Sequence, residues 1–168
     1  LPAPGIIAAP VDAEAALKTK ALKAFRALPA WAELQKSYKE NAEAAKGGWD
    51  EDGGTKPVVR KFTFSAKGRA RTLVTVTGDI AQSCGGFNGA LWGVWEVEGS
   101  KLTLKSAPDR GNALPTLAVD LDGDGEPELY FDKSLSGDFD TERGVVRPEG
   151  GKWNVFETLA VPYLDCPC

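Results

Sequence analysis

From Val58 to about residue 160, apolar residues alternate with polar ones, and short runs of turn residues interrupt the alternation. An apolar residue at every second position is typical of β-strands, whose side chains point alternately to the two faces of a sheet. The turns are short, as at Lys67-Gly68 and Glu98 to Lys101, and no helical pattern separates any two strands. Parallel neighbours need long crossover connections, so these strands are expected to pair antiparallel in a meander.

The earlier part of the chain repeats apolar residues every three or four positions, which is the period of an amphipathic helix. Pro29 separates two such stripes and suits the first position of the second helix. Asp12 is expected to cap the first helix, and Gly47-Gly48 to end the second. The stripes are formed by Leu17, Ala21, Phe25 and Leu28, and then by Trp31, Leu34, Tyr38, Ala42 and Ala45.

These patterns predict an α+β fold, in which two N-terminal helices pack on a meandering antiparallel β-sheet of about eight strands. Residues 1–11 are expected to be an extended N-terminal leader, and residues 12–168 a single globular domain. Within that domain, the helical part is predicted over 12–48, the strands over 58–160 and a C-terminal tail over 161–168. The connector between helices and strands is polar, and its consecutive acids Asp50, Glu51 and Asp52 are expected to be solvated.

One short stretch, Asp120-Leu-Asp-Gly-Asp-Gly-Glu-Pro-Glu128, carries a dense pattern of acids. Asp120, Asp122 and Asp124 occupy positions 1, 3 and 5, Gly125 occupies position 6, and further acids follow. Ca²⁺ takes six to eight oxygen ligands at about 2.3–2.6 Å, and alternating acids on a tight loop can supply several of them. The stretch therefore predicts a Ca²⁺ site formed by Asp120, Asp122, Asp124, Glu126 and Glu128, with Glu126 contributing through its carbonyl.

Two other interpretations of this stretch are an EF-hand and a hairpin that binds no metal. An EF-hand needs a bidentate Glu at position 12 and a helix after the loop. Position 12 is Phe131, Leu129 to Phe131 has the composition of a strand, and Pro127 opposes a helix. The loop is therefore expected to join two strands. The other alternative is an acidic, glycine-rich hairpin whose charges serve only solubility.

The segment from Leu117 to Phe131 resembles the calcium hairpin of FG-GAP and VCBS-type repeats, which occur in integrin-like propellers and bacterial surface proteins. The resemblance implies that Asp120, Asp122, Asp124 and Glu128 hold Ca²⁺ between two strands. It covers only this segment. A propeller needs several such repeats, and the chain holds no second Asp-x-Asp-x-Asp-Gly.

Cys84, Cys166 and Cys168 are the three cysteines of the chain. A disulfide from Cys84 to either of the others would close a loop of about 80 residues and add roughly 4 kcal/mol of stability in the chain-entropy model. Such a bond is the favoured interpretation, with one cysteine left over. A bridge within Cys166-Pro-Cys168, a zinc site and a reactive thiol pair are the alternatives.

The location and partners follow from composition. The chain lacks Met and begins with a proline-rich segment, which favours a protein exported after signal-peptide removal, although cloning could give the same start. Disulfides and Ca²⁺ fit a secreted or periplasmic location. No apolar run reaches the length of a membrane span.

Residues 1–72 carry 13 Lys and Arg against 8 Asp and Glu, and residues 73–168 carry 7 against 16. The basic residues are dispersed, which argues against nucleic-acid binding.

The absence of histidine excludes Ser-His-Asp and Cys-His catalysis and the usual zinc hydrolases. The expected function is therefore an exported, non-catalytic calcium-binding protein that acts as a binding or assembly subunit, with a protein, an envelope complex or a glycan as partner. The alternative is a carboxylate-dependent hydrolase of polysaccharide or peptidoglycan with structural Ca²⁺. Five tryptophans are its candidate sugar platforms: Trp31, Trp49, Trp92, Trp95 and Trp153.

Overall fold

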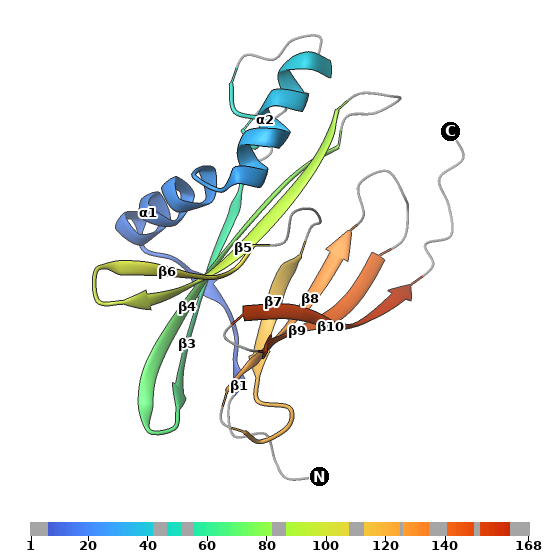
Figure 1. The fold of residues 1–168 in the computed structure, drawn as a ribbon. Helices are drawn as coiled ribbons and strands as arrows, with labels where there is room; N and C mark the ends of the chain where they lie inside the picture. Colours follow the sequence, from blue (N-terminus) through green and yellow to red (C-terminus); the bar gives the residue numbers. More distant parts are fainter. Residues whose placement is uncertain are drawn as a thin grey trace.

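The fold is α+β, as predicted, with two helices followed by a long antiparallel meander (Figure 1). The computed structural model describes residues 7–41, 47–51, 56–81, 87–107, 113–124, 126–134, 141–149 and 152–161. The elements are β1 (Ile7–Ala8), β2 (Val11–Asp12), α1 (Ala15–Arg26), α2 (Pro29–Asn41), β3 (Val58–Ala66), β4 (Arg69–Ala81), β5 (Asn88–Glu98), β6 (Lys101–Ser106), β7 (Leu114–Val119), β8 (Glu128–Ser134), β9 (Thr141–Glu149) and β10 (Lys152–Val161).

The strands form two five-stranded sheets. Sheet 1 has the order β1-β7-β8-β9-β10, and sheet 2 has the order β2-β3-β4-β5-β6. The long strands pair with their neighbours in the chain, so the predicted meander is confirmed, and it divides between β6 and β7. The Lys67-Gly68 turn between β3 and β4 is confirmed as well. Both residues have positive φ, 50° and 74°, as the tightest hairpin turns require.

Sheet 2 is the middle of three layers, with the helices on one face and sheet 1 on the other (Figure 1). Because successive side chains of a strand point to opposite faces, sheet 2 contributes to one core on each face. On β4, Leu73 faces sheet 1, whereas Val74 and Val76 face the helices. The inter-sheet core also contains Phe62, Phe64, Trp92, Val94, Ala118, Leu129, Phe131 and Val146. The helix-facing core also contains Ala21, Phe25, Leu28, Tyr38, Trp49, Leu91 and Trp95.

The described residues of the predicted helical stripes all pack on the helix-facing core, where Leu17, Trp31 and Leu34 are partly buried and the others buried, and Pro29 is the first residue of α2. The predicted cap was wrong. Helix α1 begins at Ala15 after Glu14, with no side-chain capping hydrogen bond. Asp12 belongs to β2 instead, and its carboxylate accepts a hydrogen bond from Arg60 at 2.9 Å. Asp12 therefore pairs with β3 and does not cap the helix. None of the described helices is long and apolar enough to cross a membrane.

Residues 7–12, which fall in the predicted leader or border it, pair with both sheets. Ile7 pairs with Val119 at the edge of sheet 1, and Val11 pairs with Lys61 at the edge of sheet 2. Ala8 is buried in the inter-sheet core. This short segment therefore passes from one sheet to the other along one side of the molecule.

The strands beside the acidic loop bury apolar side chains up to the point where the loop begins. Ala118 and Val119 are buried on β7, where a register shift falls between Pro115 and Leu117. Leu121 is 57% exposed because the strand ends at Val119 and the loop has already begun. On β8, Leu129 and Phe131 are buried.

Candidate metal site

The acidic stretch forms the connection between β7 and β8 in sheet 1, which confirms that the loop joins two strands. Pairing of Val119 with Glu128 places the two ends of the loop side by side. Asp120 and Glu128 are therefore drawn into the edge of the core, with exposures of 3% and 5%. Asp122 and Asp124 are exposed. The loop thus has a buried acidic base and a solvent-facing acidic rim.

The carboxylates of Asp120, Asp122 and Asp124 converge. One oxygen of each lies within 4.8 Å of one oxygen of each of the others. Three like charges this close repel one another, and a cation among them would convert that repulsion into attraction. Carboxylate oxygens are the ligands that hard cations such as Ca²⁺ prefer. The site could therefore hold a cation between two strands.

Backbone N–H groups of the loop orient these carboxylates. Gly123 donates to Asp120 Oδ1 at 2.7 Å, and Asp124 donates to Asp122 Oδ1 at 3.1 Å. Gly123 has a φ of +78°, which an L side chain rarely adopts, so glycine suits the bend at this point. Each hydrogen bond uses one oxygen of its carboxylate. An ionised carboxylate offers about four lone-pair sites, so a cation and a backbone N–H can share one side chain.

Glu128 closes the site from β8. Its Oε2 accepts a hydrogen bond from the N–H of Leu121 at 2.7 Å. Burial raises the pKa of the Glu128 carboxyl above its ordinary value; the Leu121 N–H opposes this in part, and the Asp122 and Asp124 carboxylates raise the pKa further. Glu128 therefore lies within the field of the acidic rim, as a fourth carboxylate near the cluster.

This raised pKa predicts an unusual pH dependence for the metal-free protein. With EDTA present, the free energy of unfolding is expected to fall as pH rises from the ordinary glutamate pKa, about 4.3, through the raised pKa of Glu128. The reason is that the folded state holds this proton more tightly than the unfolded state does. Urea unfolding at a series of pH values measures the effect. Glu128→Gln, which keeps an oxygen for Leu121, should remove this component, and an unchanged profile would contradict the assignment.

Glu126 differs from the other predicted ligands. Its side chain pairs with Arg71 on β4 and lies 3.6 Å from the Lys67 ammonium. Its N–H donates to Asp124 Oδ1 at 2.7 Å. Its carboxylate is thus directed at sheet 2, so the role left to it at the site is the carbonyl contribution expected from its position. Gly125 lies outside the described residues, as do Cys84, Cys166 and Cys168 and the disulfide predicted for them.

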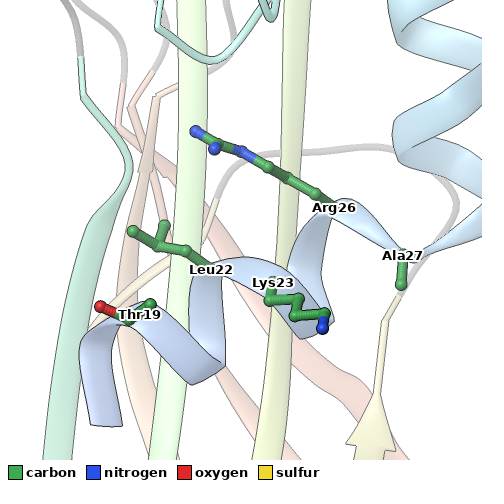
Figure 2. A pocket seen from close by; sticks show the side chains of 5 residues that line it. All are labelled: Thr19, Leu22, Lys23, Arg26 and Ala27. Carbon is green, nitrogen blue, oxygen red and sulfur yellow. The ribbon is translucent and has the colours of Figure 1, made fainter. Parts of the chain in front are cut away.

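A second feature is a surface depression of about 430 Å³ beside α1, lined by Thr19, Leu22, Lys23, Arg26 and Ala27 (Figure 2). All five residues belong to one side of the helix or its end. Arg26 is already paired, with Asp50 at 2.9 Å and with Glu51 at 2.6 Å. The depression therefore offers a lysine, a threonine and an arginine that is already paired with two carboxylates.

The expectation that Asp50 is solvated was wrong: its side chain has no exposed surface, whereas Glu51 is exposed. Asp52 lies outside the described residues. The position of Asp50 directly after the buried Trp49 is the one sequence signal for its burial. Arg71 was also missed. It shares the inward parity of Leu73 on β4, and an arginine at such a position signals a buried partner.

Comparisons with protein-family models, with curated proteins and with solved structures gave no match to this chain.

Proposed function

We propose that this protein binds Ca²⁺ in the β7–β8 loop and acts, without catalysis, as a binding or assembly subunit outside the cell or in the cell envelope. The observation that carries the proposal is the convergence of three carboxylates, from Asp120, Asp122 and Asp124, within 4.8 Å. The buried Glu128 beside them supports it, because burial in the first place, and the Asp122 and Asp124 carboxylates in addition, raise the pKa of its carboxyl, and a nearby cation would favour the charged form.

The choice of Ca²⁺ over Mg²⁺ follows from the ligands. The loop offers converging carboxylates on a backbone that is exposed along its rim. Ca²⁺ accepts irregular shells of six to eight oxygens, whereas Mg²⁺ demands a compact octahedron. A loop with a solvent-facing rim fits the modest affinities of extracellular calcium modules. This is the reason for proposing a secreted or periplasmic location.

A non-catalytic role is favoured over the hydrolase alternative by three of the five tryptophans. Trp49, Trp92 and Trp95 are buried in the two cores. Their rings stabilise the fold and are not available to stack on a sugar. A glycan array combined with a turnover assay separates the two functions: binding without turnover supports the proposal, and turnover of a polysaccharide supports the hydrolase.

The direct test is calcium-dependent stability. At a Ca²⁺ concentration one hundred times its dissociation constant, the free energy of unfolding is expected to rise by about 2.7 kcal/mol relative to EDTA, and by much less in Mg²⁺. Thermal and urea unfolding measure the change. Asp122→Ala and Asp124→Ala should fold at neutral pH but lose this gain, because each removes a ligand from a loop outside the core.

Glu40→Ala is the matched control, since it removes an acid from an exposed position on α2. It should retain the full Ca²⁺ effect. An identical melting temperature in EDTA and in millimolar Ca²⁺ would refute the proposal, and full Ca²⁺ stabilisation of Asp124→Ala would place the ion elsewhere.

A further inference from the structure

Arg71 is a charged residue on the inner face of sheet 2. On β4 it has the same parity as Leu73, which is buried between the sheets. Arg71 pairs with Phe64 on the adjacent strand β3, and the ring centroid of Phe64 lies 5.8 Å from the guanidinium carbon. The inter-sheet core therefore borders on an arginine. A guanidinium placed here must find anionic partners, because burying it unpaired is costly.

Two carboxylates satisfy Arg71. Its Nε and Nη2 donate to the two oxygens of Glu96 on β5, at 2.7 and 3.2 Å, and its Nη1 donates to Oε2 of Glu126 in the β7–β8 loop. Glu96 also pairs with Lys105 on β6 at 2.8 Å. The side chains of Arg71, Glu96 and Glu126 are 20%, 12% and 28% exposed, so this network is more shielded from water than an ordinary surface pair.

The network crosses between the sheets. Glu96, itself paired with Lys105, holds the guanidinium within sheet 2, and the remaining donor reaches Glu126 in the loop that connects β7 and β8 of sheet 1. Three N–H groups of one guanidinium serve two carboxylates, a geometry that the single ammonium of lysine does not reproduce. From Glu126 the contact continues to the loop, because its N–H donates to Asp124 Oδ1 at 2.7 Å.

We propose that Arg71 is a clasp that fixes the β7–β8 loop to sheet 2 through Glu126, so that the conformation of the loop and the docking of the two sheets form one coupled equilibrium. The clasp itself stands on the ion-pair geometry. Its consequence for calcium rests on the proposed function: Arg71, although it touches no ion, is then a positioning residue for Asp124.

A double-mutant cycle in EDTA tests the clasp. Arg71→Met, Glu126→Gln and the double variant are unfolded with urea, and the unfolding equilibrium constants are compared. We expect the effects to be non-additive by three- to tenfold, as for contacting residues in one network. The control is a second cycle that combines Arg60→Gln with Glu126→Gln. Arg60 pairs with Asp12 on β2, at the edge of sheet 2, so the effects of these two substitutions on the unfolding equilibrium should be additive.

A second readout follows the loop itself. The amide resonances of Gly123 and Asp124 should shift in Arg71→Met and remain in place in Arg60→Gln. An additive Arg71–Glu126 cycle, or unmoved loop amides, would overturn the clasp. If Arg71→Met does not fold, Arg71→Lys takes its place in both measurements.

The direction in which Arg71→Met changes the affinity for Ca²⁺ tests the positioning role. Removing a cation near a Ca²⁺ site strengthens binding by Coulomb's law alone, whereas loss of a positioning contact weakens it. We expect Arg71→Met to bind Ca²⁺ several-fold more weakly than the wild-type protein. Equal or tighter binding overturns the positioning role. If the wild-type protein binds no Ca²⁺, the proposed function fails, and the cycle measured in EDTA still decides the clasp.

Discussion

Replacing Arg26 with methionine is expected to lower the free energy of unfolding by about 3–5 kcal/mol, the usual cost of breaking a buried ion pair from one side. The substitution leaves the Asp50 carboxylate, which has no exposed surface, without the hydrogen bond that its Oδ2 accepts at 2.9 Å. Its Oδ1 has no hydrogen-bond partner among the described residues, so nothing on that side compensates. Urea unfolding at pH 7 measures the loss.

Two further variants separate this explanation from simple loss of packing. Arg26→Met combined with Asp50→Leu should recover most of the stability, because a well-packed apolar pair has no charge to desolvate. Arg60→Met removes an arginine from an exposed pair with Asp12 and should cost less than about 1 kcal/mol. If the double variant is as unstable as Arg26→Met, the buried carboxylate is not the cause.

Phe131→Ala is expected to be as damaging, with a loss of about 3–5 kcal/mol. Phe131 lies on β8, is 1% exposed and stacks on Trp92 of sheet 2, with ring centroids 6.4 Å apart. Its removal opens a cavity where the two sheets meet. In urea the midpoint should fall with little change in the slope, because the unfolded state exposes a similar surface.

Leu104→Ala provides the control for Phe131→Ala. Leu104 is 48% exposed on β6, and its truncation should change stability by less than about 0.5 kcal/mol. Equal losses from Leu104→Ala and Phe131→Ala would show that the inter-sheet core does not dominate the stability of this protein.

Local patterns predicted much of the fold correctly. The alternation of apolar and polar residues from Val58 onward identified the strands, and Pro29 and Lys67-Gly68 marked a helix start and a turn. These features depend on a few neighbouring residues, for which backbone preference and periodicity are sufficient. The acidic pattern likewise located a loop in which three of the predicted ligands converge.

Features that depend on residues distant in the sequence could not be predicted from these local patterns. Asp12 was expected to cap a helix because only its neighbours were considered, and the edge of β3 recruits it instead. Asp50 lies in a polar connector but is buried by its pairing with Arg26. The division into two sheets between β6 and β7 depends on which faces pack together, and no single stretch of sequence records it.

The short N-terminal segment that pairs with both sheets has a consequence for the order of folding. In sheet 1, β7 to β10 pair with their neighbours in the chain, but Ile7 of β1 pairs with Val119 of β7. The local hairpins close small loops and can form early, whereas β1 has to close a loop that spans most of the chain. Until β1 arrives, β7 presents an open strand edge, and during that interval the same edge can accept β1 from a second molecule.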